Sequence, residues 1–467
     1  MSESLLSLDP FSGTGFTMWQ AHQLIFEFLL YEVPGRRDHF RSYLAKKWTI
    51  SKNKKVFEFE LRESKWTDGK PVTADDVKFS LEHINNPQFK SIWVGSFQGI
   101  EKIEVINPRK IRITAKAPQF ELWKSIAVTL KVVPQHYYSD PQSPLYSKNA
   151  LGSGPYKILN FESGLKFTLE KNPGWWGWQD PELKKWYTRD QIRFIKLSDT
   201  SISAHFQKNE VDFLRVTHVH AVQELKQQQN LVLDFVTNPN RNQKMIEQIL
   251  FNLKSPLFSE LSVRKALNLA INKQPICEKS YPGSKAAGEF NVKKAQVLFK
   301  QAGWVDHDKD GVLDKQGKAF EFTVTYASSD YEVLLTQLKE EFKALGIRMN
   351  LQSIDYSLVQ KTLKDEKFQS YIDRFDDFQA VLRSTWATDG DYNYTGFSDN
   401  EVDGGLIDLA KIYEPKLREQ KEKRLRKIIS NYQHSFLLCE VKYPDFVINK
   451  KTTTPNVRKG VLQWGWF

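Results

Sequence analysis

Cysteine and methionine are scarce in this chain of 467 residues, which has two Cys and four Met. The two cysteines, Cys277 and Cys439, lie far apart and form no C-x-x-C pair, so the sequence indicates neither a metal site nor redox chemistry at sulfur. Both lie in apolar-rich segments, and we expect two buried thiols. A disulfide between them is the alternative in an oxidising compartment, because sequence does not supply the geometry of the bond.

Long hydrophobic runs are also absent. No stretch of about 20 apolar residues occurs, so we expect no membrane-spanning helix. The first residues lack a basic region, an apolar core and a small-residue cleavage site. Met1 therefore resembles the start of a mature domain, and we expect any export signal to be missing from this sequence.

Catalytic motifs are missing as well. The chain has no G-x-S-x-G elbow, no P-loop and no H-E-x-x-H pair. Its nine histidines are scattered, and only His218 and His220 are close neighbours. Such a pair could share a metal ion on a strand, although a surface or packed pair is commoner. We expect that the protein is not an enzyme and requires no cofactor.

The net charge of +11 invites a nucleic-acid interpretation. The basic residues are spread along the chain, however, and the densest run, 416–427, is interleaved with Glu, which is typical of a solvated helix face. We therefore expect no nucleic-acid partner. A composition of 40% hydrophobic and 26% charged residues indicates a folded protein, and its length indicates more than one domain.

The segment Val56–Phe79 contains the strongest local signals. Apolar and charged residues alternate from Val56 to Leu61, which predicts a half-buried strand. A turn with Gly69 follows, and Thr73 with Asp76 three residues later predicts a capped helix start. Similar reasoning predicts hairpins over 100–115 and 156–171. In the second half, strands and helices alternate, which favours mixed or parallel sheets packed by helices.

The amino-acid sequences of these segments resemble those of the family 5 extracellular solute-binding proteins, the receptors that deliver peptides to ABC importers. The resemblance lies first in F-E-L-R-E-S-K-W-T-D-G-K-P-V-T-A-D-D-V-K-F. It continues in L-D-P at the start, V-P-Q-H at 133–136, G-S-G-P-Y at 152–156 and V-R-K-A-L-N-L-A-I at 263–271. Asn209 stands where the family usually has Gly before its E-V-D. The resemblance spans essentially the whole chain.

The resemblance implies an α/β, two-lobed periplasmic-binding-protein fold of the class II or cluster C type. It implies mixed β-sheets and an extra subdomain in the first lobe. We assign 1–35, 149–245 and 447–467 to the first lobe, 36–148 to its extra subdomain and 246–446 to the second, ligand-closing lobe. Ligand would be held between the lobes, with binding favouring a closed state.

The resemblance also implies which residues bind ligand. Peptide receptors of this family hold the peptide's amino terminus with an acidic residue three places after a Trp, and Trp386 and Asp389 keep that spacing. Asp391 is the fallback carboxylate, and Trp386 and Tyr392 would form pocket walls. The alternatives are an aspartate that stabilises a turn and aromatic residues that belong to the core.

Two glycine-containing segments are further candidates for the ligand site. Gly15 and Phe16 occupy the place where relatives lay backbone along the ligand, and Gly152, Ser153 and Gly154 could do the same near the hinge. Glycine allows a close approach because it has no Cβ. A tight turn is the alternative for both segments.

A possible cation loop follows Val305. Asp306, Asp308, Asp310, Val312 and Asp314 stand at positions 1, 3, 5, 7 and 9 of a calcium-loop pattern. Its position 12 is Gly317 and not the usual bidentate Glu. The sequence therefore predicts at most a structural Ca²⁺ site of reduced affinity, with a plain turn as the alternative.

The function implied is an extracytoplasmic receptor that captures oligopeptides or peptide-like solutes and delivers them to the permease subunits of an ABC importer. We expect a monomer, in the periplasm or attached to the outer face of a membrane. The alternative is a receptor of the same fold for a nickel chelate, haem, a sugar oligomer or an opine, because fold alone does not specify ligand. Relatives usually carry a longer segment where this chain has only 282–290, so ligand size does not transfer from them.

Overall fold

The chain divides into two compact units in the computed structural model. Unit 1 comprises Met1–Asn240, Ala410–Pro415 and Pro444–Phe467, and unit 2 comprises Arg241–Leu409 and Lys416–Tyr443. The structure describes residues 8–11, 16–33, 36–89, 91, 93–140, 146, 148–198, 201–215, 219–228, 230–236, 245–355, 358–375, 382–390, 392–441 and 446–453. Across these residues, every helix is too short or too polar to cross a lipid bilayer.

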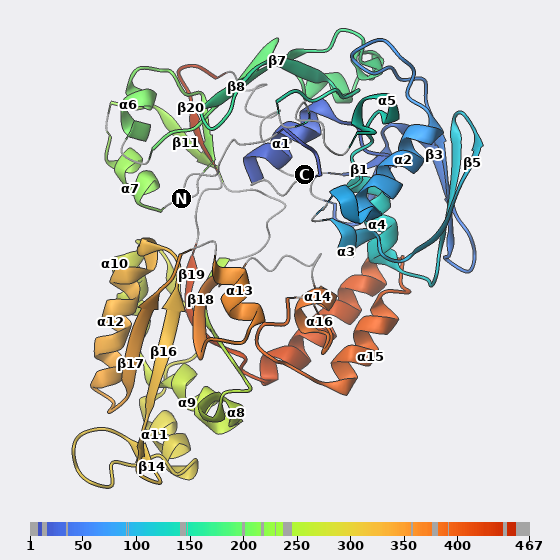
Figure 1. Ribbon diagram of the computed structural model, residues 1–467. Coiled ribbons are helices and arrows are strands. Elements are labelled where there is room, and N and C mark those ends of the chain that lie inside the picture. Colours follow the sequence, from blue (N-terminus) through green and yellow to red (C-terminus); the bar gives the residue numbers. More distant parts are fainter. Residues whose placement is uncertain are drawn as a thin grey trace. The chain divides into compact units, whose positions relative to one another are not determined.

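A four-stranded antiparallel sheet forms one part of unit 1 (Figure 1). Its strands, in order across the sheet, are β3 (Ala45–Ile50), β4 (Val56–Leu61), β6 (Lys110–Ala115) and β5 (Ile100–Asn107). The predicted alternation is confirmed, because Phe57, Phe59 and Leu61 are buried. Of the two charged residues between them, Glu58 pairs across the sheet with Arg112 at 2.7 Å and Glu60 with Lys46 at 2.8 Å.

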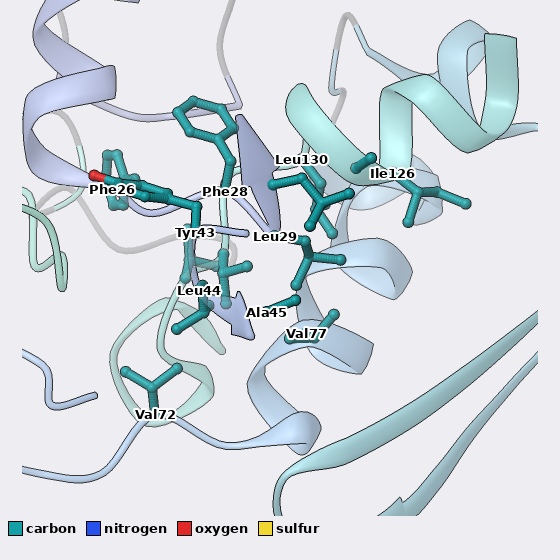
Figure 2. Packing of buried hydrophobic residues seen from close by; sticks show 14 of the residues in the cluster. Phe26, Phe28, Leu29, Tyr43, Leu44, Ala45, Val72, Val77, Ile126 and Leu130 are labelled. Carbon is teal, nitrogen blue, oxygen red and sulfur yellow. The ribbon is translucent and has the colours of Figure 1, made fainter. Parts of the chain in front are cut away.

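The helix predicted after this strand is α2 (Ala74–Asn85). Its start is stabilised as expected, because the Thr73 backbone N–H donates to Asp76 Oδ2 at 2.9 Å. Figure 2 shows the core that this helix helps to form, in which Val77 belongs to the same buried cluster as Phe28, Leu29 and Leu130. Each of these side chains is at least nine-tenths buried.

The remaining sheets of unit 1 are small. One is the antiparallel trio β7 (Tyr156–Glu162), β8 (Lys166–Lys171) and β9 (Gln191–Ile195), which contains the predicted second hairpin. Another has β20 (Phe446–Asn449) between β10 (Phe213–Arg215) and β11 (Leu233–Val236), and the third pairs β1 (Leu30–Glu32) with β2 (Phe40–Ser42). The other helices among the described residues of this unit are α1 (Phe16–Ile25), η1 (Pro87–Phe89), α3 (Val94–Phe97), α4 (Phe120–Val128), α5 (Gln135–Tyr138), η2 (Trp176–Gln179), η3 (Leu183–Lys185), α6 (Ile202–Gln207) and α7 (Val219–Gln227).

Unit 2 is built on a six-stranded mixed sheet (Figure 1). Its order is β13 (Lys285–Ala286), β19 (Ser435–Val441), β12 (Met245–Phe251), β18 (Ser370–Phe375), β16 (Glu321–Tyr326) and β17 (Arg348–Ser353). Strand β16 is parallel to both β17 and β18, and α12 (Glu332–Lys343) connects β16 to β17. The predicted alternation of strands and helices therefore gives the expected mixed sheet.

Helices and a short hairpin complete unit 2. They are α8 (Pro256–Ser259), α9 (Leu261–Ala270), α10 (Gln274–Ser280), α11 (Val292–Gln301), the hairpin of β14 (Asp314–Lys315) and β15 (Lys318–Ala319), η5 (Ser329–Tyr331), α13 (Val359–Lys364), α14 (Leu382–Trp386), α15 (Asn400–Leu409) and α16 (Pro415–Asn431). The predicted charged helix over 416–427 lies within α16.

The expectation of two free thiols is wrong. Cys277, on α10, and Cys439, on β19, form a disulfide. Both residues are fully buried, as predicted, but they are bonded to each other because the helix packs over the strand and places their Cα atoms 5.6 Å apart. The bond joins positions separated by 162 residues inside unit 2.

Candidate functional site

Asp389 lies in the loop that follows α14 in unit 2, and 72% of its side chain is exposed. One carboxylate oxygen, Oδ2, accepts a hydrogen bond from Arg383 Nη2 at 2.9 Å. Within the described part of the chain, the other oxygen has no hydrogen-bond donor. The Asp389 carboxylate is thus oriented by an arginine and still open to a cationic group. The ion pair itself contributes little to stability, since both side chains face solvent.

The aromatic residues near Asp389 differ in their surroundings. Trp386 is only 5% exposed, and its ring lies 5.7 Å from the Phe397 ring and 4.3 Å from the His434 ring, measured between centroids. It is therefore a core residue of unit 2. Burial also lowers the pKa of His434 to about 4. Tyr392 is 45% exposed, so its ring is accessible.

The predicted pocket-wall roles of Trp386 and Tyr392 stay predictions. Asp391, the fallback carboxylate, lies outside the described residues, as does Gly15. Phe16 is the first residue of α1, and only the course of its backbone is described.

Gly152, Ser153 and Gly154 lie in the interior of unit 1, against the end of α1. A Cβ on Gly152 would come within 2.0 Å of the Ile25 carbonyl oxygen, and one on Gly154 within 2.7 Å of the Leu24 carbonyl oxygen. The Gly154 N–H donates to the Ile25 carbonyl at 2.9 Å. The backbone at Gly152 and Gly154 therefore passes so close to the end of α1 that a side chain at either position would clash with it. Their predicted contact with ligand stays a prediction.

A buried carboxyl group lies in the same unit and was not singled out by the sequence. Glu27 is 0% exposed and accepts hydrogen bonds from Ser64 Oγ at 2.8 Å and from the indole N–H groups of Trp175, at 3.3 Å, and Trp176. Burial raises the pKa of Glu27, and these donors offset part of that rise. No short-range pattern marks this residue, because its partners lie far from it in sequence, at Ser64 and at the adjacent Trp175 and Trp176.

The predicted cation loop lies between α11 and β14. Asp306, Asp308 and Asp314 each bring one carboxylate oxygen within 4.8 Å of the others. Asp310 is engaged differently, since Oδ2 accepts from Arg348 Nη2 at 3.3 Å and Oδ1 accepts the Val312 N–H at 2.8 Å. Oxygens of three of the predicted ligands therefore converge, and Asp310 is not among them.

Other contacts bear on how well a calcium ion would fit this loop. Asp314 Oδ2 accepts the His307 N–H at 2.8 Å, and Asp306 Oδ2 accepts the Gly311 N–H at 3.1 Å. These bonds are turn contacts within the loop and involve no metal ion. Gly317 at position 12 supplies no carboxylate, so the converging oxygens fit a weak cation site at most.

Sequence reasoning missed the residues that support Asp389. Arg383 precedes it by six positions, and Asp403, in the first turns of α15, binds the adjacent Thr388 at 2.6 and 2.8 Å. An acidic residue near a helix start is ordinary, and only the fold shows that its partner is the loop beside Asp389. Among the described residues, this region contains an exposed carboxylate, that of Asp389, and no activated nucleophile.

Solved structures show the same fold. AppA from Bacillus subtilis, an oligopeptide-binding protein solved with a nonapeptide, has a TM-score of 0.76 and 18% identity, over 98% of this chain and 95% of AppA. NikA from Brucella suis in complex with Fe(III)-EDTA has a TM-score of 0.81 and 17% identity, over 97% and 95%. The predicted fold class, a mixed α/β periplasmic-binding-protein fold, is confirmed.

Sequence comparisons agree. The oligopeptide-binding protein AppA of Bacillus subtilis (strain 168) is 22% identical over 415 residues, which is 80% of this chain and 73% of AppA. The dipeptide-binding protein DppE of the same organism is 24% identical over 453 residues, or 87% and 79%. The family model of the bacterial extracellular solute-binding proteins, family 5 Middle, matches residues 39–395. The chain belongs to family 5 of the bacterial extracellular solute-binding proteins.

Proposed function

We propose that this protein is a receptor that binds oligopeptides or peptide-like solutes outside the cytoplasm and passes them to the permease subunits of an ABC importer. Membership of family 5 and the likeness to AppA and DppE support this proposal. The observation that carries the peptide assignment is the Asp389 carboxylate, which is exposed, lies three residues after Trp386 and has one oxygen without a donor among the described residues.

In this proposal Asp389 binds the ammonium group at the peptide's amino terminus. An ionised carboxylate and an ammonium group form a charge-assisted hydrogen bond, which is stronger than a neutral one. Arg383 would hold the carboxylate through Oδ2 while Oδ1 accepts the ligand. The protein acts by binding and release and breaks no covalent bond. It works as a monomer, with no nucleic acid, in the periplasm or on the outer face of a membrane. Lobe closure on the ligand stays a prediction.

The test is the affinity for free peptides after Asp389→Ala. We expect a loss of roughly 10- to 100-fold, because a hydrogen bond to a charged group contributes about 1.5 to 3 kcal/mol. Glu401→Ala is the matched control, since Glu401 is also an exposed acid of unit 2 and pairs with Arg424 at 3.0 Å. Titration calorimetry with a set of short synthetic peptides measures both. Unchanged affinity of the Asp389→Ala protein would count against the peptide assignment.

A metal chelate is the second candidate ligand, and the likeness to NikA, solved with Fe(III)-EDTA, favours it over haem, sugars or opines. Native mass spectrometry of the purified protein separates the two candidates, because retained cargo would have the mass of a peptide or of a metal complex. Retained metal chelate together with no affinity for peptides would replace the first proposal by the second.

A further inference from the structure

The carboxylate of Asp403, on α15, accepts two hydrogen bonds from the loop that contains Asp389. Asp403 Oδ1 accepts the backbone N–H of Thr388 at 2.8 Å, and Oδ2 accepts the Thr388 hydroxyl at 2.6 Å. The Ser398 hydroxyl lies 2.9 Å from Thr388 Oγ1. Because the Thr388 proton goes to the carboxylate, Ser398 donates to Thr388. Both oxygens of Asp403 are thus used on the residue that immediately precedes Asp389.

The rest of this loop is equally constrained. The Asn393 side-chain amide donates to the carbonyl oxygens of Ala387 at 3.0 Å and Phe397 at 2.6 Å. The Tyr392 N–H donates to the Ser384 carbonyl at 2.8 Å. Gly390 passes so close to that carbonyl that a Cβ would lie 2.3 Å from its oxygen. The backbone on both sides of Asp389 is therefore held by identified contacts, although its side chain faces solvent.

We propose that Asp403 is a positioning residue for ligand binding, acting through Thr388 to hold Asp389 where it meets the ligand's ammonium group. This inference rests on the proposed function. A charge-assisted hydrogen bond needs its two heavy atoms within about 2.7 to 2.9 Å, so a carboxylate on a loosened loop loses much of it. Binding groups placed on loops depend on such supporting contacts for their geometry. Figure 1 shows α14 and α15, the two helices that flank the loop, in unit 2.

The competing explanation is that Asp403 only stabilises unit 2. A pair of peptides distinguishes the two, namely penta-alanine with a free amino terminus and the same peptide acetylated there. Acetylation removes the ammonium group, so Asp389 can favour only the free peptide. The ratio of the two affinities reports how well Asp389 is placed. General loosening of unit 2 would weaken both peptides alike and leave that ratio unchanged.

The variants are Asp403→Ala and Thr388→Val, the second of which removes the hydroxyl and keeps the backbone N–H. Asp399→Ala is the matched control, because Asp399 stands before the same helix and accepts the Val402 N–H at 2.8 Å without contacting Thr388. Calorimetry at one pH gives the affinities, and urea unfolding shows whether each variant is folded. If Asp403→Ala does not fold, Thr388→Val supplies the test.

We expect Asp403→Ala to reduce the preference for the free peptide roughly 10-fold, and Thr388→Val by less. Asp399→Ala should keep the wild-type ratio. A wild-type ratio in both test variants, or equal weakening of both peptides, would overturn the inference while the proposed function stands. A wild-type protein that binds neither peptide, or both equally, would refute the role of Asp389 itself, and the inference would fall with it.

Discussion

Replacing Lys131 by methionine removes an ammonium group from the interior of unit 1. Lys131 is 5% exposed, and its Nζ donates to the Pro10 carbonyl at 3.0 Å and lies 4.9 Å from the centre of the Trp93 ring. Burial lowers the pKa of Lys131 to about 8, and the charge of Asp9 offsets part of this effect. The folded protein therefore holds this proton less tightly than the unfolded chain does.

The sign of the pH dependence follows from this difference. Between about pH 8 and the ordinary lysine pKa of 10.5, the unfolded chain keeps a proton that the folded state has released. The free energy of unfolding therefore rises with pH in this window. Each unit of pKa difference corresponds to about 1.36 kcal/mol, so raising the pH from about 7.5 to about 9.5 should stabilise unit 1 by about 2 kcal/mol through Lys131 alone.

Urea unfolding followed by tryptophan fluorescence measures this gain in the wild type and in Lys131→Met. In Lys131→Met, the free energy of unfolding of unit 1 should lack the rise with pH that Lys131 contributes in the wild type. Lys273→Met is the matched control in unit 2, because Lys273 is 1% exposed, donates to the Asn268 carbonyl at 2.9 Å and has a pKa lowered to about 8 by burial. The measurements should stay below about pH 10, because tyrosines of the unfolded chain begin to titrate there and would add their own pH dependence.

The outcome that would refute this reasoning is a Lys131→Met protein whose unit 1 gains as much stability with pH as the wild type. That result would mean that Lys131 titrates at an ordinary pKa and that water reaches its ammonium group. If replacing either lysine reduced the pH-dependent rise in the free energy of unfolding equally in both units, the two units would unfold together.

Two further predictions concern unit 2. Replacing Cys277 and Cys439 by serine should lower its free energy of unfolding by up to about 5 kcal/mol, on a chain-entropy estimate for a 162-residue separation. Reductant should lower the urea midpoint of the wild type but not that of the variant. Equal wild-type midpoints with and without reductant would contradict the disulfide. Millimolar Ca²⁺, but not Mg²⁺, should raise the melting temperature of unit 2, and Asp306→Asn should remove the rise, because Asp306, Asp308 and Asp314 converge while position 12 lacks a carboxylate. No rise with Ca²⁺ would leave the loop as a plain turn.

Local features of the fold were predictable because their causes lie within a few residues. Alternation over 56–61 gives the β4 strand, and Thr73 with Asp76 marks the start of α2. The hairpin around Gly164 is equally local, since a turn residue with positive φ joins two alternating segments. Periodicity and capping act over such short distances that no knowledge of the tertiary structure is needed.

Contacts between distant residues were not predictable in this way. The cysteines were expected to be thiols, because the pattern around each one shows burial and does not show that α10 packs over β19. The sequence does not show that Lys131 is buried or that its Nζ donates to the Pro10 carbonyl. Burial and pairing depend on packing across the chain, and they decide pKa values and bond formation.

The candidate site divides in the same way. The sequence by itself determined the family, the order of most strands and helices, and the spacing that singles out Asp389 after Trp386. Only the tertiary structure shows that Trp386 is 5% exposed, that Arg383 orients the Asp389 carboxylate and that Asp403 hydrogen-bonds to the loop. The physical reason is that a motif records residue types along the chain, whereas a binding group works through distances between atoms that folding brings together.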